Sequence, residues 1–250
     1  MNPMTIIARK EAGELLLSSR GLAWLLALSA IMSVLSLLLV SNTELSLLDN
    51  AQVVYMVMGT VTALGSLLAV VLGSDTIAGE RERGSLLPLL LAPIKPSQIV
   101  FGKMGGQLSG WLVMYLISLP YVWAVGSSGQ NLAQSILYLA LMGTPVVLGF
   151  GFMSIALSAR LRTVRSSMLT SIIILVLLTS PLLLGPSLRQ STIGKWFDAV
   201  NPFSAAVNAY DSVVIDSQPL QVQLIRLSVA MVWLVATSWL AVRSIKKLEP

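Results

Sequence analysis

Charged side chains that could do chemistry or recognise a partner gather in one stretch of this chain, from Asp75 to Lys103. The stretch holds 7 of the 27 charged residues, and its centre reads Glu80-Arg81-Glu82-Arg83. On a short helix this order offers one Glu-to-Arg ion pair three residues apart, worth about 0.3 kcal/mol. So small a contribution to stability indicates that these charges serve contact with a water-soluble partner.

The residues after Arg83 are apolar and bounded by helix breakers. Gly84 precedes a leucine-rich run, which is interrupted by Pro88 and ended by Pro93 and Pro96. The run contains Leu86, Leu87, Leu89, Leu90 and Leu91. Ser97 is suited to cap the helix that follows. The pattern predicts a helix, a bend, a short apolar helix and a sharp turn, which form a protrusion with a charged neck and an apolar edge.

The chain offers no catalytic set of its own. It has no His and no Cys, which excludes a Ser-His pair, a thiolate nucleophile and an imidazole-ligated metal. It also lacks a Gly-x-x-x-x-Gly-Lys-Ser/Thr loop, which would cradle phosphates. We therefore expect no enzyme activity, no bound metal and no bound cofactor.

The elements that position this stretch are predicted to be membrane helices. Mean hydropathy is +0.82, and 11% of residues are charged, against roughly 25% in soluble chains. A spanning helix needs about 20 apolar residues, and six runs qualify. They are approximately Gly21–Val40, Val53–Gly73, Met104–Val125, Leu132–Leu157, Met168–Gly185 and Leu224–Val242. The expected fold is a single all-α transmembrane domain over residues 1–250 with six spans.

Basic residues predict the orientation, because loops rich in Lys and Arg stay cytoplasmic. One set of faces carries 13 of the 16 basic residues. They are Arg9, Lys10, Arg20, Arg81, Arg83, Lys95, Lys103, Arg160, Arg162, Arg165, Arg243, Lys246 and Lys247. Both termini and residues 74–103 are then cytoplasmic, in a multi-pass protein of the inner (cytoplasmic) membrane. This topology accounts for the net charge of +5, and no nucleic-acid partner is expected.

Two segments outside the spans have further predicted roles. Residues 1–20 have the spacing of an amphipathic helix at the cytoplasmic interface, acting as a membrane-surface elbow or as a docking helix. Residues 186–223 form an outer-face segment, whose aromatic residues fit an interfacial belt or a gate. These are Trp196, Phe197, Phe203 and Tyr210. Pro120, Pro145 and Pro181 are expected to bend the third, fourth and fifth spans.

Small residues at a spacing of four mark close helix packing. They are Gly65, Ala69 and Gly73 in the second span, and Gly102, Gly106 and Gly110 at the third. Contacts within one chain are favoured over a subunit interface. Arg160, Arg162 and Arg165 form a second cytoplasmic contact candidate, with a plain topological anchor as the alternative.

The pattern Asp-x-x-Ala-Gly-Glu-Arg-Glu-Arg-Gly-Ser-Leu from Asp75 to Leu86, followed by Leu-Leu-Leu-Ala-Pro-Ile, resembles the cytoplasmic loop of ABC-2 type transporter permeases. The start Ile7-Ala8-Arg9-Lys10-Glu11 and the motif Asn201-Pro202-Phe203 are similar to other parts of that family. Pro88 departs from the family pattern, which has a polar helix former there.

The resemblance implies a permease that dimerises, as a homodimer or a heterodimer, above ATP-binding cassette subunits that bind ATP and Mg. It makes residues 74–103 the coupling loop. The implied ATPase contacts are Glu80, Arg81, Glu82, Arg83, Gly84, Leu86, Leu87, Leu90 and Leu91. The expected function is export or movement of an amphipathic, lipid-like cargo, or mechanical work. A non-transporting anchor or assembly factor that recruits a cytoplasmic protein remains the alternative.

Overall fold

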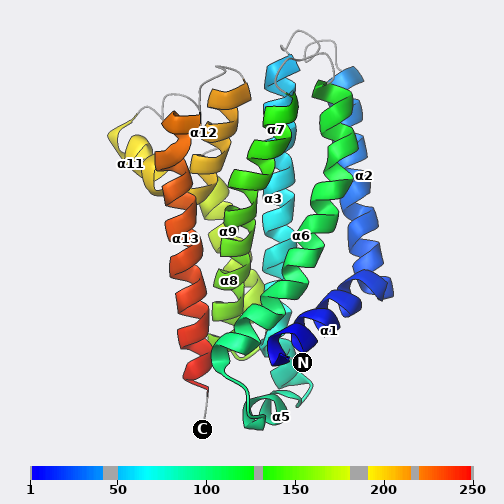
Figure 1. Ribbon diagram of the computed structural model, residues 1–250, viewed down its shortest axis with the longest axis vertical. Coiled ribbons are helices and arrows are strands. Elements are labelled where there is room, and N and C mark those ends of the chain that lie inside the picture. Colours follow the sequence, from blue (N-terminus) through cyan, green and yellow to red (C-terminus); the bar gives the residue numbers. More distant parts are fainter. Residues whose placement is uncertain (1, 42–49, 127–131, 181–190, 215–219, 249–250) are drawn as a thin grey trace.

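Long helices run side by side in the computed structural model, which describes residues 2–41, 50–126, 132–180, 191–214 and 220–248. Over these residues the chain is all helical, without a strand. In chain order the elements are α1 (Pro3–Leu17), α2 (Ser19–Ser41), α3 (Asn50–Thr76), α4 (Ala78–Glu82), α5 (Leu86–Leu91), α6 (Pro96–Gly126), α7 (Leu132–Tyr138), the π-helical segment η2 (Leu139–Gly143), α8 (Thr144–Arg160), α9 (Val164–Thr179), α11 (Thr192–Val200), α12 (Pro202–Val214) and α13 (Leu220–Lys246). Figure 1 shows α1, α5 and the last turn of α13 at one end of the bundle, called the α5 end below.

Four described helical stretches are long and apolar enough to cross a membrane. They are Gly21–Leu38, Val53–Glu82, Leu132–Arg160 and Gln223–Lys246. The remaining two predicted spans correspond to α6, which runs along the bundle in Figure 1, and to the 16-residue helix α9. Part of the fifth predicted span, beyond Ser180, lies outside the described residues. The all-helical membrane fold is therefore supported, and the count of six stays a prediction.

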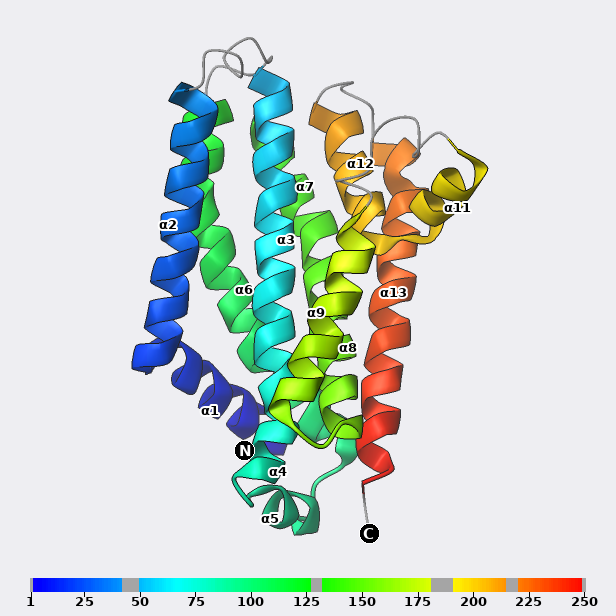
Figure 2. The ribbon, with the colours of Figure 1, turned by 180° about the vertical axis from the view of Figure 1, so that it is seen from behind.

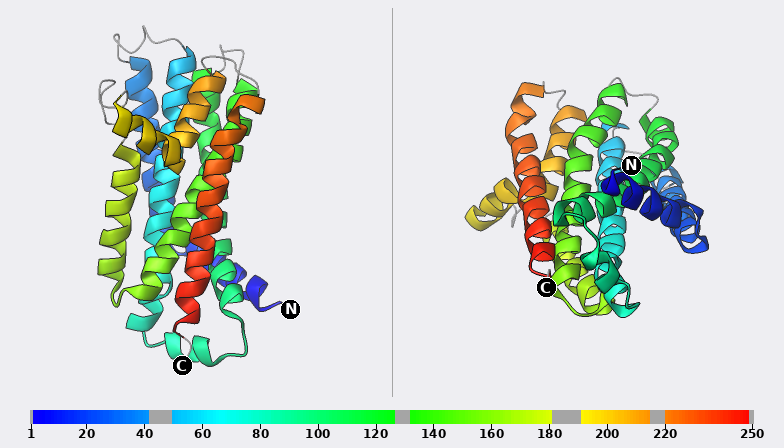
Figure 3. Two further views of the ribbon diagram at one scale, coloured as in Figure 1. Left: turned by 90° about the vertical axis from the view of Figure 1, so that its left-hand side faces the viewer. Right: turned by 60° about the horizontal axis from the view of Figure 1, so that its bottom comes forward.

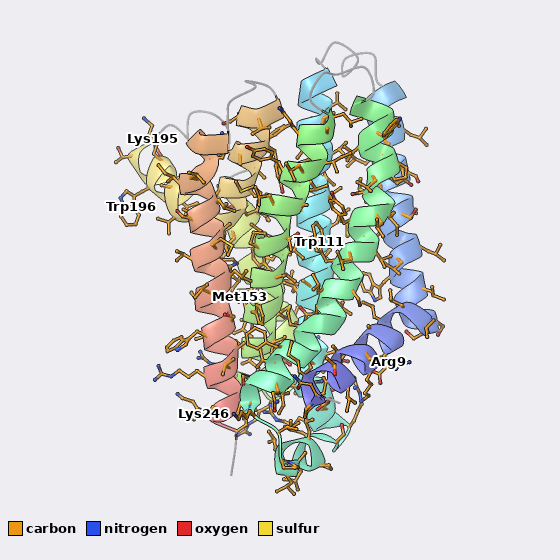
Figure 4. The ribbon with its side chains drawn as sticks, in the orientation of Figure 1. Arg9, Trp111, Met153, Lys195, Trp196 and Lys246 are labelled. Atoms are coloured by element: carbon orange, nitrogen blue, oxygen red, sulfur yellow. The ribbon has the colours of Figure 1, made fainter. Side chains whose placement is uncertain are left out.

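The core lies around α3 and α8. Figure 2 shows α3 in the middle of the bundle, with α2 on one side and α8, α9 and α13 on the other. Trp111, Phe150 and Met58 are among the largest fully buried side chains, and Figure 4 shows Trp111 pointing between helices at mid-height. The indole of Trp111 donates a 3.0 Å hydrogen bond to the hydroxyl of Thr144. By contrast, α2 and α13 are largely exposed, as expected for helices that face lipid.

The predicted proline positions have different local structures. Pro145 is the second residue of α8, just after the π-helical segment η2. Proline and a π-helical turn both interrupt the regular hydrogen bonds of an α-helix. Pro120 lies inside the continuous helix α6. Pro181 is outside the described residues.

The outer segment contradicts part of the aromatic-belt prediction. Trp196 is 75% exposed on α11, as Figure 4 also shows, but Phe203 and Tyr210 on α12 are fully buried. The hydroxyl of Tyr210 lies 2.9 Å from that of Thr62 on α3. The side chain of Asn201 accepts from the backbone N–H of Phe203 and caps α12. The helix α12 is therefore built into the bundle core, where both aromatic residues are buried and Tyr210 contacts α3.

Candidate functional site

A sharp corner joins α1 to the bundle. Gly21 stands where α1 meets α2, and a Cβ there would lie 1.6 Å from the carbonyl oxygen of Leu15. Only glycine fits at such a distance. Ser18 accepts a 3.0 Å hydrogen bond from the backbone N–H of Gly21. As a result α1 lies across the α5 end at a steep angle to the long helices, as Figure 3 shows.

The helix α1 packs on the glycine stripe of α6. A Cβ added at Gly102 would lie 2.8 Å from Cβ of Ile7, and one at Gly106 would lie 2.4 Å from Cβ of Glu11. At Gly110 the nearest atom is a methyl carbon of Leu15. The first predicted stripe also packs within the chain. Gly65 faces Trp111, Gly73 faces Ser154, and Ala69 is buried between them.

A buried ion triad joins α1, α4 and α6. The Nζ of Lys103 is 2.8 Å from Oε1 of Glu11 and 2.8 Å from Oε1 of Glu80. The Lys103 side chain is 3% exposed, that of Glu80 13% and that of Glu11 22%. Burial opposes the charge on Lys103, but the two carboxylates prevail and raise the pKa of Lys103 above its ordinary value. The ammonium group therefore stays charged in the interior.

The other charges of α4 are also used within the chain. Arg81 donates to the carbonyl oxygens of Leu161 and Ala159, at 2.5 and 3.1 Å, and so satisfies orphan acceptors at the end of α8. Glu82 accepts a 2.9 Å hydrogen bond from the N–H of Val164, at the start of α9. A carboxylate is favourable at a helix N-terminus. These bonds fix α4 to the turn between α8 and α9.

The predicted ion pair between Glu80 and Arg83 is wrong. Arg83 donates a hydrogen bond to the carboxylate of Asp75 in the preceding helix, and this bond raises the pKa of Arg83. Glu80 binds Lys103. A short-range pairing rule omits these partners from α3 and α6, and the expectation that the charges contribute little to stability stays a prediction.

The break between α3 and α4 is held by Ser158 of α8. Its hydroxyl accepts from the N–H groups of Ile77 and Ala78, at 3.1 and 2.8 Å, and donates to the carbonyl of Ser74. All these groups are buried. The sequence pattern gave no signal for Ser158, since a serine in an apolar span is common.

The turn from α4 to α5 requires glycine at position 84. Gly84 has φ of +73°, which L side chains rarely adopt. The N–H of Ser85 bonds to the carbonyl of Glu80, and that of Gly84 to the carbonyl of Arg81. This is a Schellman cap, which ends α4 and turns the chain into α5.

The short helix α5 has one packed face and one exposed edge. Leu86 and Leu89 pack against a buried cluster that includes Ile99 and Phe152. Leu87 and Leu91 are 62% and 66% exposed. With the exposed ring of Pro88 these two residues form what is called the α5 edge below, and Leu90 is partly buried beside it.

The three arginines of the second contact candidate lie at the same end of the bundle. Arg160 donates a 3.0 Å hydrogen bond from Nε to the hydroxyl of Ser244, which ties α8 to α13. Arg162 and Arg165 are exposed in and after the turn that Arg81 contacts. They thus lie in or beside the turn to which Arg81 and Glu82 of α4 are bound. Among the described residues, no group of three or more acidic side chains could hold a metal ion.

Comparison with known proteins identifies the family. The family model of the ABC-2 family transporter proteins matches residues 5–247. The chain is also 32% identical over 112 residues to the probable ABC transporter permease protein NosY of Stutzerimonas stutzeri. That match covers 43% of this chain and 39% of the relative, so the chain matches about two fifths of that relative's length. The resemblance seen in residues 75–103 is thereby confirmed, and the chain belongs to the ABC-2 family of transporter proteins.

Proposed function

We propose that this chain is the membrane subunit of an ABC transporter, with six spans, and that its α5 edge docks a separate ATP-binding cassette subunit in the cytoplasm. The observation that carries the proposal is the α5 edge itself. Leu87 and Leu91 are more than 60% exposed on a helix whose opposite face is packed. Exposed apolar residues on an ordered protrusion are typical of a protein-binding site.

The distribution of basic residues supports the cytoplasmic position of the α5 end. Figure 4 shows Arg9 and Lys246 at this end and Lys195 at the other. The α5 end also carries most of the remaining lysines and arginines, which is the pattern of a cytoplasmic face. Both termini would then be cytoplasmic, in the inner membrane.

The α5 protrusion is attached so that force on it reaches several helices. Glu80 connects it through Lys103 to α6 and α1, and Arg81 and Glu82 connect it to α8 and α9. In this proposal, closure of the ATPase moves α5, and the triad carries the movement to α1. Of the predicted contact residues, Glu80, Arg81 and Glu82 act as internal braces, while Leu87 and Leu91 touch the partner.

We also propose the kind of cargo that this membrane subunit moves. The described spans contain no ring of charged side chains, which favours a lipid-like or amphipathic cargo, or mechanical work, over a small ion. The subunit would act as a pair of copies with one ATPase beneath each. ATP and Mg would bind in the ATPase.

The test is the double variant Leu87→Ala/Leu91→Ala. Each truncation removes about 1–2 kcal/mol of apolar burial at the interface, so affinity for the ATPase should fall at least about 30-fold. The measurement is co-purification of an ATP-binding cassette protein with the tagged chain in mild detergent, followed by its ATP turnover. Leu17→Ala is the matched control, because Leu17 is 84% exposed on α1.

Undiminished co-purification of the double variant would contradict the docking proposal. Loss of the ATPase from the control as well would show a general defect. An ATPase that binds but whose turnover never responds to any lipid or amphipathic cargo would favour the anchor alternative.

A further inference from the structure

A cavity of about 410 Å³ opens beside the ion triad, between α1, α2, α3 and α6. This volume lies in the range of small-molecule sites. Its walls include Glu14, Asp75, Arg83, Gln107, Trp24 and Leu72. Charged, amide and apolar groups of the described residues therefore line one cavity.

The charges in this cavity are only partly neutralised within the chain. Lys103 is balanced by Glu11 and Glu80, and lies 3% exposed behind them. Arg83 and Asp75 pair with each other but are 58% and 49% exposed. Glu14 has Lys10 at 3.7 Å, with both side chains more than 60% exposed. A weak surface pair leaves Glu14 able to bind another cation.

Gln107 also lines this cavity. Gln107 is 4% exposed, yet neither Oε1 nor Nε2 has a hydrogen-bond partner among the residues the structure describes. Gly151 of α8 makes room for the amide, since an added Cβ there would lie 2.1 Å from Oε1. A buried amide without a hydrogen-bond partner is unfavourable, so this position calls for a polar ligand group.

The polarity of the cavity changes along the bundle axis. Asp75 and Arg83 line it toward the α5 end, while Leu72 and Trp24 line it one turn or more toward the middle of α3 and α2. Trp24 is 42% exposed, and tryptophan is enriched where a helix crosses the surface of a membrane. A ligand with a charged head and an apolar tail fits this gradient.

We propose that this cavity binds the headgroup of phosphatidylethanolamine from the cytoplasmic leaflet, which rests on the membrane orientation given above. The primary ammonium donates to Glu14, and the phosphate accepts from Arg83. The amide of Gln107 donates to an ester oxygen, and an acyl chain lies along Leu72 and Trp24. Soluble phosphoethanolamine carries the same ammonium and phosphate groups as the lipid headgroup. The apolar wall of the cavity favours the lipid.

The experiment measures lipid retention by native mass spectrometry of the full delipidated chain. The chain is incubated with equal amounts of phosphatidylethanolamine, phosphatidylcholine and phosphatidylglycerol of the same acyl chains. We expect phosphatidylethanolamine to be retained at least about 5-fold over phosphatidylcholine, whose methylated amine cannot donate hydrogen bonds. Glu14→Gln should abolish this preference, and Gln107→Leu should lower retention about 10-fold.

Two matched controls separate the site from indirect effects. Lys10→Gln removes the same surface pair as Glu14→Gln but leaves the carboxylate in the cavity, so the preference should persist. Gln134→Leu makes the amide-to-leucine change at an exposed position on α7 and should change nothing. Glu14 is exposed, so the Glu14→Gln variant should fold. The proposal can therefore be tested even if Gln107→Leu does not fold.

Equal retention of the three lipids, or a preference that survives Glu14→Gln, would overturn the proposal. Displacement of the lipid by soluble phosphoethanolamine at similar concentration would overturn the lipid assignment. Because the measurement needs no ATPase, failure of the lipid site and failure of the proposed transport function give different results.

Discussion

Replacement of Lys103 by methionine tests the buried triad directly. Methionine has a similar length and removes the charge, which leaves two carboxylates facing each other with 13% and 22% of their side chains exposed. The lysine itself is 3% exposed, so water cannot replace it without a change in packing. We expect α1 and α4 to separate from α6 in this variant.

The size of the effect follows from the burial. Removing one partner of a buried pair costs about 3–5 kcal/mol. Partial exposure of both carboxylates reduces this to about 2–4 kcal/mol, since each can take up some water. For a chain of 250 residues this corresponds to a fall in melting temperature of roughly 5–15 °C.

The assay is thermal unfolding in mild detergent, followed by tryptophan fluorescence, on a set of variants. The triple variant Lys103→Met/Glu11→Gln/Glu80→Gln should recover to within about 1 kcal/mol of the parent, because neutralising all partners removes the uncompensated charge. Glu11→Gln and Glu14→Gln are matched variants three residues apart on α1. Glu11 pairs with the buried Lys103, and Glu14 pairs with the exposed Lys10.

We expect Glu11→Gln to be clearly destabilising and Glu14→Gln to cost about 0.5 kcal/mol or less. A Lys103→Met variant that loses less than about 1 kcal/mol would refute the reasoning. Equal effects of the two glutamate variants would refute it as well.

Four further outcomes can be checked by the same melting assay. Gly106→Val should cost about 1–3 kcal/mol because its side chain would collide with α1, while Gly13→Ala, with open space around it inside α1, should be stabilising by up to about 1 kcal/mol. Ser158→Ala should cost about 1–3 kcal/mol by leaving two buried N–H groups at the start of α4 without an acceptor, and a neutral result would show that these groups find another partner. Asn201→Ala should cost about 1–3 kcal/mol by removing the cap of α12 and the hydrogen bond to the carbonyl of Leu178, and Asn201→Asp should not restore stability, because its buried carboxylate would face that carbonyl oxygen. Because the pKa of Lys103 is raised above 10.5, the stability it contributes should be complete below pH 10.5 and lost as pH rises through the raised value, a loss that the triple variant should not show.

Local patterns in the sequence predicted much of the helical framework. Apolar runs, Gly84 and Pro96 are local signals, because each acts on residues close to it in the chain. The helices and the turn that they predict are present. The role of α12 was harder to predict. Aromatic residues such as Phe203 and Tyr210 occur both at membrane surfaces and in cores, and only their burial in the folded bundle distinguishes the two settings.

The candidate site depends on pairs that are distant in sequence. Glu11 and Lys103 are 92 residues apart, and Glu80 and Lys103 are 23 apart. Each glutamate has a basic residue within four positions, so short-range rules offered a different partner for both. The glycine stripe at Gly102 and Gly106 was visible, but the identity of the helix that it receives was not.

The separation of Glu11 and Lys103 also orders events during synthesis. At about 5–20 residues per second, the ribosome needs roughly 5–20 s to extend the chain from Glu11 to Lys103, which are 92 positions apart. Throughout that interval α1 has neither its countercharge nor the groove that receives it. The docking of α1 in its final position is therefore a late step, which has to follow the synthesis of α6.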